Sequence, residues 1–121
     1  MKNLVQASPS EDGTKKLELA APAALVSGQF ALIGQFPVVA VTDLENAERG
    51  TFLVEQIISY AKESSSAVFA EGDVVFFDES ANEMTDTSDT LANSVVGIAV
   101  KAAINTDTEV VFKMASRISA A

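Results

Sequence analysis

The segment Glu71-Gly72-Asp73-Val74-Val75-Phe76-Phe77-Asp78 decides the fold class of this 121-residue chain. Two β-branched and two aromatic residues stand between a Gly-Asp turn and a further Asp, which is the pattern of a short strand. Runs that are apolar, or that alternate apolar and polar residues, predict further strands at residues 15–20, 29–33, 37–42, 50–60, 94–101 and 108–114. The sequence therefore predicts a mainly β fold, a small β-barrel or β-sandwich.

Sequence that favours helix is scarce. Residues 44–49 have the composition of a single helical turn after an Asp43 cap, ended by Gly50. Residues 61–70 offer a second start, weakened by three consecutive serines. We expect at most one or two short helices.

The length of the chain suits one domain with a single core. Residues 1–16 are rich in loop-forming residues, and Leu4 and Val5 are their only large apolar side chains after Met1. Composition alone favours a frayed terminus, and the alternative is an extended arm that pairs with the sheet edge of a neighbouring chain. We divide the chain into an N-terminal arm, residues 1–16, and a single β-rich domain, residues 17–121.

The two halves of the chain contain a faint echo. Ser27-Gly28-Gln29 and Glu71-Gly72-Asp73 each precede an apolar strand, and each is followed later by a second apolar run, at residues 38–42 and 96–100. Because a Gly beside a polar residue is common turn chemistry, the sequence favours convergence on one turn type as the explanation.

Composition excludes several classes of function. The chain has no His and no Cys, which leaves no Ser-His-Asp triad, thiol nucleophile, disulfide, zinc site or haem site. It has no Gly-x-Ser-x-Gly elbow and no Gly-rich phosphate loop, so a Ser–Lys hydrolase has no supporting motif. We expect a protein that is not an enzyme and has no cofactor.

The charge of the chain argues against two classes of partner. The formal net charge is -9, and no Lys or Arg lies between Lys62 and Lys101. Nucleic acid and anionic membranes both select for cationic surfaces, so we expect neither as a partner. The apolar runs are far shorter than the ~20 residues that span a bilayer, and the N-terminus lacks the apolar stretch of a signal peptide.

The acidic stretch at residues 78–89 is the best candidate for a metal site. Asp78, Ser80 and Asn82 have the 1-3-5 spacing of an EF-hand calcium loop. The match then fails, because Glu83 stands where Gly is needed and Asp89 where a bidentate Glu is expected. A solvated hairpin tip is the favoured interpretation, and these three residues stay weak metal candidates.

Phe76 and Phe77 are candidates for a subunit interface. Adjacent residues of a strand point to opposite faces, so one ring faces the core and the other faces outward. An outward Phe needs cover, which a second subunit supplies. This pair therefore indicates an oligomer.

Five stretches, taken in order, resemble the small capsid cement or decoration protein family of tailed bacteriophages. The resemblance covers nearly the whole chain, and departs from the family at residues 7–16, which are longer, and at residues 55–69. The five stretches are Met1-Lys2-Asn3-Leu4-Val5-Gln6, Ala20-Ala21-Pro22-Ala23-Ala24-Leu25-Val26-Ser27-Gly28, Val39-Ala40-Val41-Thr42-Asp43, Glu71-Gly72-Asp73-Val74-Val75-Phe76-Phe77-Asp78 and Val95-Val96-Gly97-Ile98-Ala99-Val100.

The resemblance implies a non-enzymatic structural protein on the outer surface of a phage head, made in the cytoplasm of the host bacterium. It implies homotrimers at local three-fold positions, with the major capsid protein as partner, that stabilise the shell. It also shifts the interpretation of the N-terminus towards an arm laid on the capsid, with Lys2, Asn3, Leu4, Val5 and Gln6 as its binding residues. The alternative is a virion-surface module that binds a carbohydrate or a receptor, with the acidic loop at residues 78–89 assisted by Ca²⁺.

Overall fold

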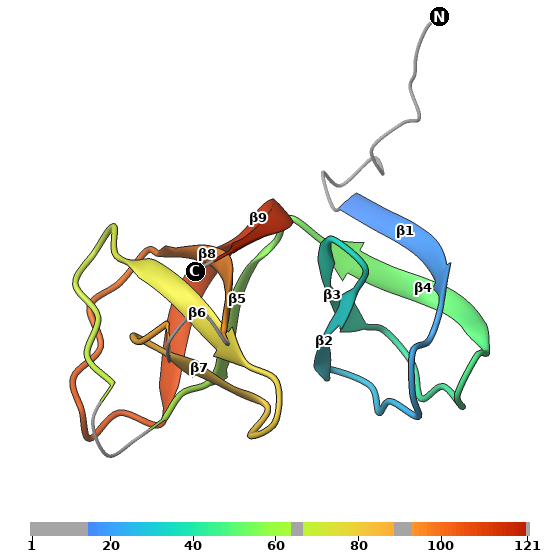
Figure 1. The fold of residues 1–121 in the computed structure, drawn as a ribbon, viewed down its shortest axis with the longest axis horizontal. Helices are drawn as coiled ribbons and strands as arrows, with labels where there is room; N and C mark the ends of the chain where they lie inside the picture. Colours follow the sequence, from blue (N-terminus) through green and yellow to red (C-terminus); the bar gives the residue numbers. More distant parts are fainter. Residues whose placement is uncertain (1–14, 64–66, 89–92, 121) are drawn as a thin grey trace, which may run out of the picture.

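The computed structural model describes residues 15–63, 67–88 and 93–120, and within these ranges nine strands form two antiparallel sheets (Figure 1). The four-stranded sheet has the order β1-β4-β3-β2 and consists of β1 (Lys15–Ala20), β4 (Arg49–Val54), β3 (Phe36–Ala40) and β2 (Phe30–Ile33). The five-stranded sheet has the order β5-β9-β8-β6-β7 and consists of β5 (Ile57–Ala61), β9 (Glu109–Ala120), β8 (Ser94–Ala99), β6 (Val74–Asp78) and β7 (Glu83–Thr85). The mainly β prediction is confirmed, with a sandwich-like arrangement.

The two expected helix starts do not form helices in the residues that the structure describes. Asp43 does not cap a helix, because its Oδ1 accepts a hydrogen bond from the backbone N–H of Ser27, 2.8 Å away. The following residues form a turn in which Ala47 has φ +69° and the Glu48 carboxylate accepts from the N–H of Glu45. No helix in the described ranges is long and apolar enough to cross a membrane.

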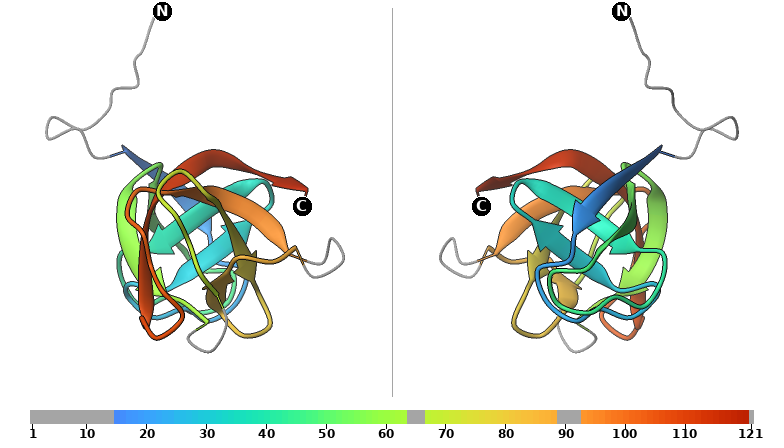
Figure 2. Two further views of the ribbon diagram at one scale, coloured as in Figure 1. Left: turned by 90° about the vertical axis from the view of Figure 1, so that its left-hand side faces the viewer. Right: turned by 90° about the vertical axis from the view of Figure 1, so that its right-hand side faces the viewer.

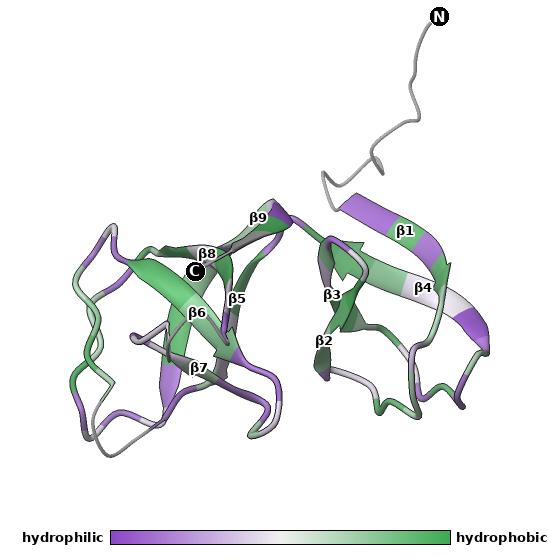
Figure 3. Cartoon of the chain, in the orientation of Figure 1, coloured by the Kyte–Doolittle hydropathy of each residue, from purple (hydrophilic) through white to green (hydrophobic). Residues whose placement is uncertain are grey.

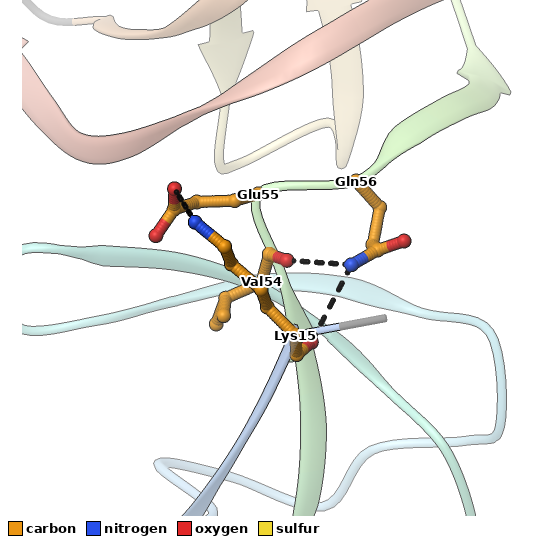
Figure 4. Close-up of polar contacts among 4 residues, drawn as sticks. All are labelled: Lys15, Val54, Glu55 and Gln56. Atoms are coloured by element: carbon orange, nitrogen blue, oxygen red, sulfur yellow. Dashed lines mark hydrogen bonds and ion pairs between the residues drawn. The ribbon is translucent and has the colours of Figure 1, made fainter. Parts of the chain in front are cut away.

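The run at residues 50–60, predicted as one strand, is broken at Glu55. This residue has φ +56°, and the chain leaves the four-stranded sheet there and enters the five-stranded one. The Gln56 side chain donates to the carbonyl oxygens of Val54, at 2.9 Å, and Lys15, at 3.5 Å (Figure 4). The break is thus held by polar contacts that the apolar pattern of the run does not reveal.

The two sheets share a core centred on Phe30. Phe30 comes from the four-stranded sheet, and Phe77 and Phe112 come from the five-stranded sheet. The centroid of the Phe30 ring lies 4.7 Å from the ring centroid of Phe77 and 6.2 Å from that of Phe112. All three side chains are buried. Burying one such ring contributes roughly 1.5–3 kcal/mol, so Phe30 couples the sheets strongly. Figure 2 shows one sheet behind the other, and Figure 3 shows apolar strands such as β2, β6 and β8 in green.

A second, smaller core lies on the other face of the four-stranded sheet. Phe52 is buried there with Val38 and Val54, under the loop residues Leu25 and Leu44. Leu25 and Leu44 exchange backbone hydrogen bonds of 2.9 and 2.8 Å, which close this cover. Both faces of the four-stranded sheet are therefore apolar near its centre.

The two halves of the chain repeat one architecture. The strand order β1-β4-β3-β2 of the first half reappears in the second half as β5-β9-β8-β6, with β7 added at the edge. Turns repeat as well: Gly28 (φ +87°) donates to the carbonyl of Ala40, and Gly72 (φ +91°) donates to that of Ala99, each at 2.8 Å. The sequence alone favoured shared turn chemistry, whereas the structure repeats the whole four-stranded unit.

The free edges of the five-stranded sheet approach one another. Lys62, after β5, forms a parallel bridge with Met84 of β7, and the N–H of Glu63 donates to the Met84 carbonyl at 2.9 Å. The Lys62 side chain is buried, and its ammonium donates to the carbonyls of Glu63 and Ala67, both at 2.8 Å. These contacts hold the curled edge of this sheet in place.

Candidate interaction surface

The Phe76–Phe77 pair occupies opposite faces of β6, as strand geometry requires. Phe77 is buried in the shared core, whereas Phe76 lies on the outer face and is half-buried. In the register Phe76 is opposite Val95 of β8 and Thr85 of β7. Of the two predicted interface residues, only Phe76 is therefore placed to contact another molecule.

A row of exposed side chains crosses the outer face of the five-stranded sheet. Ile57 of β5 and Ile98 of β8 are both opposite Lys113 of β9, and Val74 of β6 is opposite Ile98. Residues opposite one another in antiparallel strands project from the same face. Ile57 is 62% exposed and Ile98 is 43% exposed, so the row is an apolar stripe interrupted by one ammonium.

A shallow pocket of about 290 Å³ lies beside this row. Its wall includes Glu55, Ile98 and Lys113, and Gly97 is also part of the lining. β8 and β9 come so close at Gly97, where the register shifts, that a Cβ there would lie 2.7 Å from the Phe112 ring. Glu55 pairs with Lys15 at 3.0 Å (Figure 4), so the start of β1 joins the same surface.

A second pocket, of about 360 Å³, lies over β6 and β7 and is acidic. Glu63, Asp78 and Glu83 line it together with Thr85 and Asn93. Asp78 and Glu83 are directly opposite one another in the register, which places like charges side by side. This acidic pocket is distinct from the pocket beside Lys113, which Glu55 lines.

Of the three weak metal candidates, Asp78 and Ser80 lie together and Asn82 is directed elsewhere. Asp78 Oδ1 accepts from the hydroxyl of Ser80, at 2.8 Å, and from the N–H of Ala81. Asn82 has φ +56°, its Oδ1 accepts from the Tyr60 hydroxyl, and its Nδ2 donates to the Phe30 carbonyl. In the ranges described, no three acidic side chains come together as a metal site.

The predicted binding residues of the N-terminal arm, Lys2, Asn3, Leu4, Val5 and Gln6, lie outside the described residues. Lys15 and Lys16, which the sequence analysis assigned to that arm, belong to β1. The segment that precedes the β domain is thus residues 1–14.

Comparison with protein families decides the class of the molecule. A family model described as phage cement protein matches residues 10–114, which is most of the chain. The chain belongs to the phage cement protein family. No curated protein and no solved structure matches it. Membership gives this cement protein a structural role in the capsid of a bacteriophage, and confirms the resemblance seen in its motifs.

Sequence reasoning did not find the row of Ile57, Ile98 and Lys113. Ile98 and Lys113 stand at outward positions of strands that were predicted, so alternation gives their face. Which residues lie side by side depends on the register between β5, β9 and β8, and these strands are far apart in the chain. The register between two strands cannot be predicted from the sequence of either strand alone.

Proposed function

We propose that this cement protein binds the outer surface of the phage head, contacts the major capsid protein and stabilises the shell. The match of the cement protein family over residues 10–114 is the observation that carries the proposal. The exposed apolar row on the five-stranded sheet supports it, because large apolar side chains left in water mark surfaces that bind other proteins. In this role the protein is not an enzyme and uses no cofactor.

We infer that the protein acts as a homotrimer at local three-fold positions. Symmetric copies multiply weak contacts, so modest interfaces are sufficient to hold a decoration protein on its shell. Phe76, with Val95 beside it, offers an apolar patch for the contact between copies. Both side chains are half-buried in the single chain and gain burial on assembly.

Residues 1–14 act in this proposal as an arm, with Lys2, Asn3, Leu4, Val5 and Gln6 pairing with a strand of the capsid. Main-chain hydrogen bonds between an extended segment and a sheet edge supply affinity without a preformed pocket. At about 3.3–3.6 Å per residue, fourteen extended residues reach on the order of 45–50 Å. That length is enough to extend beyond the footprint of a domain of this size.

The proposal is tested by co-sedimentation of the purified protein with expanded shells of its own phage that lack it. We expect saturable binding, with three copies per local three-fold position. A variant without residues 1–14 should lose shell binding and keep the circular dichroism spectrum of the β domain. Absence of binding by the unaltered protein would refute the capsid role, and full binding by the shortened variant would refute the role of the arm.

The same preparation tests the carbohydrate-binding or receptor-binding alternative. That reading requires the acidic loop to take up Ca²⁺, and saturable binding of a ligand to the folded state raises the melting temperature. Because Asn82 is already bonded to Tyr60 and Phe30, we expect no calcium-dependent shift. A saturable shift would favour the alternative.

A further inference from the structure

The cationic side chains of this acidic protein are unevenly placed. Lys113 lies in the exposed row, and Arg117 is exposed four residues further along β9. Lys15 joins them through Glu55, which it contacts at 3.0 Å and which lines the pocket beside Lys113. We call Lys15, Ile57, Ile98, Lys113 and Arg117 the cationic face.

The carboxylates close to the cationic face already have partners: Glu55 pairs with Lys15, and Glu109, four residues before Lys113 on β9, accepts from the hydroxyl of Ser59 at 2.7 Å. Glu55 is the single acidic residue that lines its pocket, and it is already paired with Lys15. In the ranges that the structure describes, this pair is the only ion pair, so Lys113 and Arg117 are not neutralised by any carboxylate there. In a chain of net charge -9, Lys113 thus lies between two exposed isoleucines, Ile57 and Ile98, and Arg117 adds a second cation further along the same strand.

We propose that the cationic face docks on an acidic, partly apolar protein surface of the capsid shell, an inference that rests on the capsid role proposed above. Lys113 and Arg117 supply charge complementary to carboxylates, and Ile57 and Ile98 supply apolar area.

The shell is preferred to a second copy of the chain as the occupant because the chain belongs to a family of phage cement proteins. A second copy also offers carboxylates, since the chain has 17 Asp and Glu residues, and it is one of the outcomes that the test below separates. Nucleic acid is disfavoured because the net charge of the chain is strongly negative.

The test measures binding to expanded shells that lack the protein, for Lys113→Glu and Arg117→Glu. The control is Lys101→Glu, which makes the same change in net charge at an exposed lysine between β8 and β9 that does not line the pocket. Reversal of a charge at a docked interface creates like-charge contacts, so we expect Lys113→Glu and Arg117→Glu each to weaken binding about tenfold or more. The control should bind as the unaltered protein does.

Salt dependence provides a second readout that does not rely on charge reversal. Binding by the unaltered protein should weaken as the NaCl concentration rises, and Lys113→Gln should show a shallower dependence. Circular dichroism and melting of each variant separate loss of folding from loss of binding, and Lys113→Gln stands in if a reversal does not fold.

Two results would overturn this inference while leaving the capsid role intact. One is full shell binding by both reversal variants, and the other is a change in sedimentation of the free protein with no change in shell affinity, which would make the face a contact between copies. Failure of the unaltered protein to bind shells would instead overturn the capsid role, and this inference with it.

Discussion

Gly97 is the residue that allows β8 and β9 to approach at the register shift. A Cβ at this position would lie 2.7 Å from the Phe112 ring and closer still to the backbone carbonyl oxygen of Lys113. Neither neighbour is the flexible end of a side chain, because one is backbone and the other is a buried ring. The same residue lines the pocket of the cationic face, so packing and surface shape depend on it together.

We predict that Gly97→Ala lowers the free energy of unfolding by about 1–3 kcal/mol, because the added methyl group overpacks the junction of the two strands. Urea unfolding followed by circular dichroism measures this change. Gly34→Asn is the matched control, since Gly34 has φ +59° with open space around it and Asn tolerates that conformation. The control should change the value by less than about 0.5 kcal/mol, and an equal loss in both variants would contradict the argument.

A second prediction concerns the Tyr60 hydroxyl. It accepts from the backbone N–H of Phe30 at 3.0 Å and donates to Asn82, whose amide donates in turn to the Phe30 carbonyl. Tyr60→Phe leaves a buried N–H without its acceptor, and we expect a loss of about 1–3 kcal/mol in the free energy of unfolding.

Ser59→Ala is the control for Tyr60→Phe, because it also removes one hydroxyl from β5, in this case from an exposed bond to Glu109. We expect that change to stay below about 0.5 kcal/mol. Urea unfolding measures both variants. Comparable losses would show that the hydrogen bonds among Phe30, Tyr60 and Asn82 contribute no more to the free energy of unfolding than an exposed hydrogen bond does.

At the scale of the elements, β2 links the two sheets through one side chain. Phe30 belongs to β2 by its register with β3, yet its ring lies among those of Tyr60, Phe77 and Phe112 in the other half of the chain. The hairpin of β2 and β3 therefore contributes a buried ring to the core of the other sheet, and packing between the sheets depends on the size of Phe30.

We predict that Phe30→Ala destabilises the protein by about 3–5 kcal/mol, since it removes a fully buried ring and leaves a cavity. Phe36→Ala, at the start of β3, is the control, because Phe36 is an exposed aromatic residue of the same hairpin. Chemical denaturation measures both. A small effect of Phe30→Ala would mean that the shared core closes around the gap, and Phe30→Leu gives a milder test if the alanine variant does not fold.

Most of the strands could be predicted from the sequence, because their β-branched and aromatic runs are local signals. β1 was predicted with its bounds, and β2, β3, β6 and β8 within two residues. β7 was missed because Glu83-Met84-Thr85 has only one apolar side chain, which pairs with β6 and faces the core. β9 continues to Ala120, beyond the predicted end, where Ile118 donates to the backbone of Gln35 at 2.8 Å. That contact comes from the other half of the chain.

The candidate surface could be predicted only in part. Strand alternation gave the inward and outward positions of Phe76 and Phe77, which a period of two residues determines. The same rule did not give the position of Asn82, because a positive φ in the β6–β7 turn directs its amide towards Tyr60 and not towards Asp78. Positions that depend on register or on a turn conformation need the folded chain.

At the scale of the whole molecule, the repeated halves share one core, so we expect them to unfold as one cooperative unit. The larger core contains Phe30 and Val39 from the first half. Its other buried residues come from the second half, and residues of β5 pack against it. Loss of either half would expose this cluster to water. We therefore expect that neither half folds on its own.

This arrangement predicts coincident unfolding curves by two probes. Tyr60 is the only tyrosine and the chain has no tryptophan, so intrinsic fluorescence reports the junction, whereas far-UV circular dichroism reports all strands. In urea the two midpoints should agree, as they do in two-state unfolding. Separate midpoints would show that one half unfolds while the other persists.

The two-residue connection at Glu55 and Gln56 has a topological consequence. The contacts that join the halves do not depend on whether both halves come from the same chain, so two molecules that open at this connection can exchange halves and rebuild the native contacts between the halves, apart from those within the connection itself. The closed monomer is favoured at low concentration because its halves are tethered. Refolding of concentrated protein should therefore yield entwined dimers with the strand content of the monomer, and a longer connection at Glu55 should reduce their yield.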